Sequence, residues 1–346
     1  MTGADTPAAS ANEPRVATRT VALVGFEGLQ LLDLTGPVEV FSQATRLLQE
    51  EGDARTPAYR VIFSAPERGR VASSSGLSLL CECARRELPE TDTLLVVGGA
   101  GTWRASEDET LLDWLRERAH QSRRFGSVCT GALVLGRAGL LDGRRATTHW
   151  QYIGELARLV PTARVSPEAI FVQDGNLWTS AGVLAGMDMA LAMVEQDWGK
   201  SLALEVARRL VMYQQRAGSA AQRSTALEAQ AAAAEGRFRQ LADWIPHHLA
   251  EDLSVPRLAA RFDMSPRHFA RCFREELGVT PAKFIEQLRF EAARQALGEG
   301  SASVEDVAGH CGFGCAETLR RVFQRRLGMG PSAYRRQARE GQHGTA

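Results

Sequence analysis

The stretch LAARFDMSPRHFARCFREELGVTP at residues 258–281 is nearly repeated by VAGHCGFGCAETLRRVFQRRLGMGP at residues 307–331. In each copy a short helical segment leads into a tight turn, and a second helical segment with several arginines follows. A match that extends over a whole repeat of this kind rarely arises by accident. The repeat therefore predicts two helix-turn-helix units that read DNA.

The second helix of the first copy has a predicted start and end. Ser265 can accept hydrogen bonds from free amides of the first turn, and Pro266 suits a position whose N–H needs no partner. The helix is expected to stop near Gly278. Its apolar residues recur at four-residue steps and form one stripe: Phe269, Phe273 and Leu277. Its arginines fall on the other side: Arg267, Arg271 and Arg274.

The second helix of the second copy repeats this division into two faces. Its apolar stripe consists of Leu319, Val322, Phe323 and Leu327. Four polar residues lie roughly opposite this stripe: Glu317, Arg321, Gln324 and Arg325. Arg320 lies at the margin between the two faces. In a major groove, arginine can bind guanine with two hydrogen bonds and glutamate can accept one from cytosine. The alternative is a solvated face, the commoner explanation for one helix alone, but the repeat favours DNA binding.

With this repeat, residues 238–336 resemble the DNA-binding domain of AraC/XylS-type transcription regulators. The resemblance implies seven helices, with a long helix at about residues 281–297 between the two units. It places base-facing residues at matching positions of both units: Arg267, His268, Arg271, Ala316, Glu317, Arg320 and Arg321. Arg274 of the basic stripe completes the candidate DNA-binding set.

The first half of the chain has a different pattern, in which short β-rich runs alternate with helical ones. The expected strands are residues 20–24, 59–65, 94–97, 124–128, 146–148 and 177–180. Strands that alternate with helices predict a mostly parallel sheet with helices on both faces. The fold class is therefore α/β, with flavodoxin-like layering, followed by an all-α domain of two helix-turn-helix units.

The segment FGSVCTGALVLG at residues 125–136 carries the strongest chemical signal of this half. An apolar strand runs into Cys129, and small residues after it permit the sharp turn of a nucleophile elbow. A thiol at a helix N-terminus is expected to have a lowered pKa. Asp33, His149 and the glycines of residues 98–101 also follow predicted strands. The carboxyl ends of strands are where open α/β sheets bind ligands, so these groups predict one pocket.

These motifs resemble the ThiJ/PfpI branch of the class I glutamine amidotransferase-like superfamily. Together with the C-terminal half they resemble the GlxA-type regulators, from Val21 to Arg336 and including WTSAGVLAGMD at residues 178–188. The resemblance assigns Cys129 to the elbow, Asp33 to the acidic contact of the thiol and His149 to a downstream histidine. It makes Gly99 and Thr130 the amide donors of the ligand-binding pocket.

Three functions are compatible with these residues. The first is a sequence-specific transcription regulator, not an enzyme, controlled by a small metabolite bound near Cys129. The second is a hydrolase or hydratase activity of Cys129, Asp33 and His149, for which isocyanide hydration by relatives of this fold is a comparison. The third is redox or adduct sensing by a reactive, exposed thiol. Attachment to a DNA reader favours the first.

Composition places this protein among cytoplasmic, reduced proteins. Lys and Arg number 41, as do Asp and Glu, so DNA affinity has to come from local arginine placement. No run of 18 apolar residues exists, and the start lacks an export signal, which predicts no membrane contact. The six cysteines, including the pair Cys81 and Cys83 on one side of a predicted strand, lack disulfide-framework density or finger spacing. Neither a metal nor a cofactor is expected.

The domain boundaries follow from these patterns. The expected parts are a disordered tail 1–17, a ligand-sensing domain 18–199, a helical connector 200–236, a DNA-binding domain 237–338 and a loose tail 339–346. The expected partner of the second half is a double-stranded DNA operator. The resemblance to GlxA-type regulators implies a small, amino-acid-like or other nitrogenous effector and a homodimer, and RNA polymerase is a further partner compatible with such a regulator.

Overall fold

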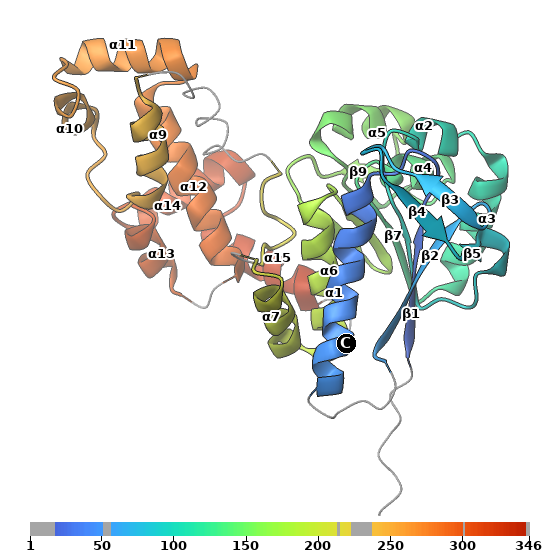
Figure 1. Cartoon of the computed structure of the whole chain (residues 1–346). Helices are drawn as coiled ribbons and strands as arrows, with labels where there is room; N and C mark the ends of the chain where they lie inside the picture. Colours follow the sequence, from blue (N-terminus) through green and yellow to red (C-terminus); the bar gives the residue numbers. More distant parts are fainter. Residues whose placement is uncertain (1–17, 51–56, 213–214, 223–236, 300–301, 344–346) are drawn as a thin grey trace, which may run out of the picture.

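The structure, a computed structural model, describes residues 18–50, 57–212, 215–222, 237–299 and 302–343. Figure 1 shows an α/β domain, residues 18–212, and a helical domain, residues 237–343, which meet near α6, α7 and α15. The tail 1–17 and the Ala-rich part of the predicted connector lie outside the described residues. Among the described helices, none combines the length and hydropathy needed to cross a bilayer.

A seven-stranded sheet with the order β10-β11-β7-β6-β1-β2-β5 forms the centre of the α/β domain. All neighbours pair in parallel except β10 and β11. The strands are β1 Arg19–Val24, β2 Tyr59–Ala65, β5 Cys83–Ala84, β6 Thr93–Val96, β7 Arg124–Val128, β10 Phe171–Asp174 and β11 Leu177–Ser180. The mostly parallel sheet is confirmed. The strand expected at 146–148 shrinks to β8, Arg145–Ala146, which pairs with β9, Arg164–Val165, outside this sheet.

Helices cover both faces of the sheet, as the alternating pattern predicts (Figure 1). One face packs against α1 Leu31–Glu50, α6 Leu184–Trp198 and α7 Lys200–Arg209. The other packs against α3 Glu109–Gln121, α4 Gly131–Arg137 and α5 Ile153–Leu159, near the short α2 Thr102–Ala105. The central strands are buried on both sides, which explains why they read as continuous apolar runs.

The two cysteines near residue 82 do not share a face. Cys81 ends β4, Ser78–Cys81, which pairs with β3, Gly69–Ala72, in a separate hairpin, whereas Cys83 begins β5 of the main sheet. Cys81 packs into the core beneath α1, and Cys83 packs against the core on the other face. The change of sheet breaks the strand alternation that the sequence suggested.

The predicted helical connector 200–236 differs from the structure in two respects. Its first part, α7, buries Leu202, Ala203 and Val206 in the core of the α/β domain, so this domain extends beyond residue 199. Residues 215–222 contain no helix, and Ala221 instead forms a β-bridge with Ala169. Burial of an apolar face, rather than helix propensity, therefore decides where the connector begins.

The described helical domain contains seven α-helices, as the resemblance implied. They are α9 Arg239–Trp244, α10 Val255–Ala260, α11 Pro266–Leu277, α12 Pro281–Glu299, α13 Val304–His310, α14 Ala316–Leu327 and α15 Pro331–His343. The long helix α12 belongs to two cores, since Phe284 packs with the first unit and Phe290 with the second. The tail expected to be loose from residue 339 continues α15 to His343.

Candidate ligand pocket and DNA interface

Cys129 occupies a sharp turn between β7 and α4. Its φ of 57° lies in the left-handed region, which a non-glycine residue adopts only at a cost. The turn is held from both sides, because the Cys129 amide donates to the Ser180 carbonyl at 2.9 Å and its carbonyl accepts from Thr148 Oγ1 at 2.8 Å. The structure thus has the strained elbow geometry that the sequence predicts, and it directs the side chain into the domain interior.

Asp33, in the first turn of α1, is the acidic group beside this thiol. Its side chain is fully buried, and Oδ1 accepts from the Val183 amide at 2.6 Å. Oδ2 accepts no hydrogen bond of standard geometry from any described residue. Burial outweighs the interactions with the Val183 amide, the Cys129 thiol and the Gly98 amide and raises the pKa of Asp33 to about 6. A buried carboxylate oxygen of this kind favours a ligand that donates to it.

The Cys129 thiol does not have the lowered pKa expected from its position at a helix N-terminus. Desolvation and then the negative charge of Asp33 raise the pKa of Cys129 to about 12, although the Thr130 amide acts in the opposite direction. The thiol is also buried rather than exposed, since only 8% of the residue is accessible. The lowered pKa and the exposure that the sequence predicts for this thiol are therefore wrong, and the structure offers no support for redox sensing by Cys129.

The two expected amide donors have different surroundings. The Gly99 amide donates to Thr130 Oγ1 at 3.0 Å, so it is already engaged and does not face the pocket as a free donor. The Thr130 amide instead interacts with the Cys129 thiol. Thr130 Oγ1 also lies 2.7 Å from Thr102 Oγ1, which fixes the start of α4. Of this pair, Thr130 alone can donate where a ligand of Cys129 would sit.

His149 does not complete a catalytic triad in this structure. It is half-buried, and among the described residues it has no hydrogen bond with Cys129. Its Nδ1 accepts from the Gln151 amide at 3.4 Å, and its ring lies against Trp150 and Tyr152. Desolvation lowers the pKa of His149. The residue before it, Thr148, donates to the Cys129 carbonyl, so His149 lies next to the elbow in the chain without a hydrogen bond to the thiol.

Two residues beside Cys129 and Asp33 were not singled out from the sequence. Gly182 has φ of 98°, and a Cβ there would lie 2.8 Å from Cys129 Sγ. Val183 has φ of 49° and donates to Asp33, so a strained backbone joins the acid to the elbow. Both lie within the WTSAGVLAGMD segment, which was noted only as part of the resemblance. In the described chain, no cluster of three His, Cys, Asp or Glu side chains could hold a metal ion.

The first recognition helix, α11, forms as the sequence predicts. The Ser265 side chain accepts from the His268 amide at 3.3 Å, and Gly278 ends the helix with φ of 72°. Phe269 and Phe273 are fully buried and pack around Phe238. The polar candidates all lie exposed on the other side: Arg267, His268, Arg271 and Arg274. The ion pair of Arg271 with Glu275 at 3.1 Å is solvent-exposed, so DNA can displace it at little cost.

The second recognition helix, α14, has the same construction with one difference. Phe323 is buried between Phe290 and Tyr334, while Glu317, Arg320 and Arg321 are exposed. Arg321 makes no ion pair or hydrogen bond with any described residue and is free to meet a base. Ala316, which the resemblance placed toward the bases, is only 8% exposed and faces the core instead. Its position as the first residue after the turn explains this orientation.

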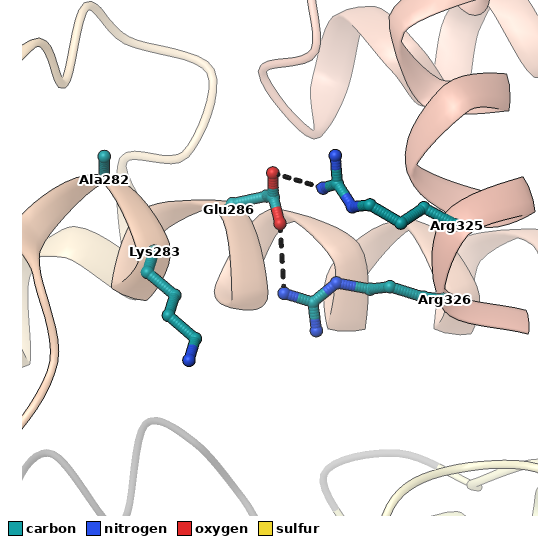
Figure 2. Close-up of a pocket in the computed structure, with 5 residues that line it drawn as sticks. All are labelled: Ala282, Lys283, Glu286, Arg325 and Arg326. Carbon is teal, nitrogen blue, oxygen red and sulfur yellow. Dashed lines mark hydrogen bonds and ion pairs between the residues drawn. The ribbon is translucent and has the colours of Figure 1, made fainter.

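A shared carboxylate fixes α14 on α12. Figure 2 shows Glu286 of α12 between two arginines of α14, with Oε2 at 2.6 Å from Arg325 and Oε1 at 3.1 Å from Arg326. The two arginines hold the pKa of Glu286 below its usual value, although burial acts against them. The Arg326 guanidinium also lies 5.0 Å from the Phe290 ring centre. These contacts orient the second recognition helix relative to the long helix that carries both units.

Comparisons with known proteins agree with both halves of this description. The DJ-1/PfpI family model matches residues 19–196, and a helix-turn-helix domain model matches residues 258–337. The HTH-type transcriptional regulator CdhR of Pseudomonas aeruginosa is 32% identical over 295 residues, which are 85% of this chain and 87% of the relative. The HTH-type transcriptional regulator GlxA of Rhizobium meliloti is 28% identical over 325 residues, 93% of this chain and 98% of the relative.

A relative with a different printed activity matches the α/β half. The isonitrile hydratase of Pseudomonas putida is 41% identical over 172 residues, which are 49% of this chain and 68% of the relative. The combined matches confirm the resemblance to GlxA-type regulators that the motifs suggested.

Proposed function

This chain belongs to the DJ-1/PfpI family and to the transcription regulators that join such a domain to an AraC-type helix-turn-helix domain, and we propose that it binds an operator through α11 and α14 under the control of a small metabolite. The observation that carries the DNA-binding part is the pair of exposed arginine faces on a common support. Both faces are exposed, and α12 belongs to the core of each unit.

Two such helices suit adjacent major-groove entries on one face of DNA, about 34 Å apart. Arg271 in the first unit and Arg321 in the second are the residues proposed to bind guanine. Arg267, His268, Arg274, Glu317 and Arg320 complete the proposed interface. A homodimer would present four reading helices to a repeated operator. RNA polymerase is a further proposed partner when the operator adjoins a promoter.

Fluorescence anisotropy with duplexes that tile the chain's own promoter region tests this interface in the full-length protein. Replacement of Arg271 or Arg321 by Ala should each weaken binding by about 1–3 kcal/mol and relax base preference at one position. The control is Arg208→Ala, because the Arg208 side chain is 80% exposed on α7, far in sequence from either unit. Equal affinity of wild type and both recognition-helix variants would count against the proposed interface.

We further infer that the effector binds beside Asp33 and Cys129. The support is the buried carboxyl of Asp33, whose Oδ2 has no hydrogen bond of standard geometry among the described residues. The Cys129 thiol and the Gly98 amide interact with this carboxyl only weakly enough that burial still raises its pKa, and the thiol itself is protonated at neutral pH. This surrounding suits a small ligand with an N–H or ammonium donor, consistent with a nitrogenous metabolite. Thr130 is the proposed backbone donor to its acceptor atom, with Gly99 and His149 as neighbours rather than direct contacts.

A thermal-shift screen of amino acids, their amides and quaternary amines against the full chain tests this site, with operator affinity measured for each compound that binds. A ligand that controls DNA binding must prefer one arrangement of the domains, since equal affinity for both changes nothing. Asp33→Asn should remove the thermal shift of an effective compound. Retention of the full shift in this variant would place the effector elsewhere.

A second candidate function is hydration of isocyanides, which the 41% identity to an isonitrile hydratase favours. In that reaction the Cys129 sulfur would add to the terminal carbon while the thiol proton moves to the substrate through Asp33. Water would then replace the sulfur and release the N-substituted formamide. Cyclohexyl isocyanide incubated with the chain tests this by mass spectrometry of the formamide. The regulator alone predicts no product, whereas product that disappears in Cys129→Ser would establish the activity.

A further inference from the structure

A cavity of about 950 Å³ lies between the α/β domain and the helical domain, away from Cys129. Its walls come from three parts of the chain: β10, β11, α6 and α7 on one side, residues 215–219 at the connector, and α12, α15 and the end of α14 on the other. Tyr334 of α15 closes part of it, with its hydroxyl donating to Ser219 Oγ at 2.7 Å. The volume lies within the range of small-molecule sites.

Arg294 is an unpartnered charge in this cavity. It projects from α12, lines the cavity and is only 8% exposed. Within the described part of the chain, its guanidinium makes no hydrogen bond and no ion pair. A buried cation without a partner is costly, so proteins rarely keep one unless something pairs with it.

The cavity is also lined by two carboxylates, Glu168 and Glu195, and by three further cations, Arg145, Lys200 and Arg216. Among the described residues, none of these five has a hydrogen bond or an ion pair with Arg294. Arg216 already binds Asp188 at 2.7 Å, and Glu195 accepts from the Gln215 side chain at 3.3 Å. The apolar part of the wall includes Phe171, Trp178, Leu204 and Met329. The rings of Phe171 and Trp178 stack with an interplanar angle of 22°.

We propose that this cavity is a second ligand site, which takes a small carboxylate with an apolar or aromatic body. The guanidinium of Arg294 forms two parallel hydrogen bonds with the carboxylate, and the body packs against the aromatic wall. Because the ligand touches both domains, it stabilises the arrangement in which α15 rests on the connector. The site does not involve Cys129 or Asp33 and goes beyond the proposed effector site.

Calorimetric titration of the full-length protein with phenylacetate tests the site, with benzoate, indole-3-acetate and hexanoate as further probes. Phenylacetamide is the matched uncharged control and should not bind. Arg294→Gln should weaken phenylacetate binding by about tenfold or more, since it removes a charge-assisted pair, while Arg294→Lys should retain part of the affinity. Arg208→Gln, on the exposed side of α7, should change nothing.

Equal binding of phenylacetate and phenylacetamide would overturn the proposal, as would unchanged affinity in Arg294→Gln or no binding of any of the four acids. If circular dichroism shows that Arg294→Gln does not fold, phenylacetate binding is measured in Leu204→Trp instead. This substitution narrows the cavity from the α/β side, and undiminished phenylacetate binding would overturn the site. Asp33→Asn should leave phenylacetate affinity intact, and the readout needs no DNA, so failure here is distinct from failure of the proposed function.

Discussion

Arg216 of the connector and Asp188 of α6 form an ion pair in which the carboxylate is fully buried and the nitrogen lies 2.7 Å from Oδ2. The Arg216 amide also donates to Oδ1 at 2.9 Å. Arg216→Ala should destabilise the protein by about 2 kcal/mol, because it leaves a buried carboxylate with one backbone donor; the figure allows for the partial exposure of Arg216. Urea unfolding followed by tryptophan fluorescence measures this loss.

The control for this prediction is the double variant. Asp188→Asn in the Arg216→Ala background should recover part of the lost stability, because it removes the buried charge. A loss below about 0.5 kcal/mol in the single variant Arg216→Ala would contradict the prediction.

Two cysteines of the chain should differ in reactivity toward iodoacetamide. Cys315 is exposed, and hydrogen bonding from Thr318 lowers the pKa of its thiol, whereas burial and Asp33 raise that of Cys129. At pH 8, Cys315 should be alkylated at least about tenfold faster, since the thiolate is the nucleophile. Peptide mass spectrometry of the native protein follows both sites in one sample. Similar alkylation rates at Cys129 and Cys315 would mean that the surroundings of Cys129 open readily in solution.

The raised pKa of Asp33 makes this carboxyl a pH-dependent destabiliser. Between its ordinary value of 3.8 and about 6 the folded state binds more protons than the unfolded state, so stability falls as pH rises through this interval. The ionised group therefore costs about 3 kcal/mol above pH 6 and nothing below both values. The stability of Asp33→Asn relative to wild type should rise between about pH 4 and pH 6.5, measured by unfolding at a series of pH values. A flat difference would contradict it.

Gly182 and Gly199 offer a matched pair for the pocket. Both have positive φ, 98° and 88°, so alanine is strained at each. A Cβ at Gly199 meets nothing within 4 Å, whereas one at Gly182 runs into the Cys129 side chain. Gly199→Ala should cost about 1 kcal/mol, and Gly182→Ala clearly more, because it also displaces the elbow. Thermal unfolding compares them, and equal losses would show that Cys129 moves aside freely.

The periodic parts of the fold could be predicted from the sequence because their residues repeat a local rule. The strands 59–65, 124–128 and 177–180 match the structure to the residue, and α11 begins and ends at its predicted caps. In these segments burial, propensity and capping point to the same structure. Segments without such agreement were not predicted, among them the antiparallel edge strand β10 and the non-helical connector at 215–222.

The proximity of Cys129 and Asp33 was predicted, but the electrostatics of the pair were not. The sequence brings Cys129 and Asp33 to one end of the sheet, where the structure has them interact. Local reasoning from a helix N-terminus indicated a lowered thiol pKa, but α4 is short and the thiol is desolvated next to an acid. The backbone of Val183, which holds Asp33, has no signal in the residue types themselves. Effects that depend on burial by distant segments require coordinates.

The contact of Tyr334 with Ser219 makes the two DNA-reading units unequal. The unit that contains α14 leans on the connector, whereas α10 and α11 project to the far end of the molecule (Figure 1). We therefore expect a movement of the connector to shift the unit of α14 more than the unit of α11. In the proposed complex with an operator, the half-site bound by α11 would stay bound whatever the position of the connector, and the half-site bound by α14 would respond to it.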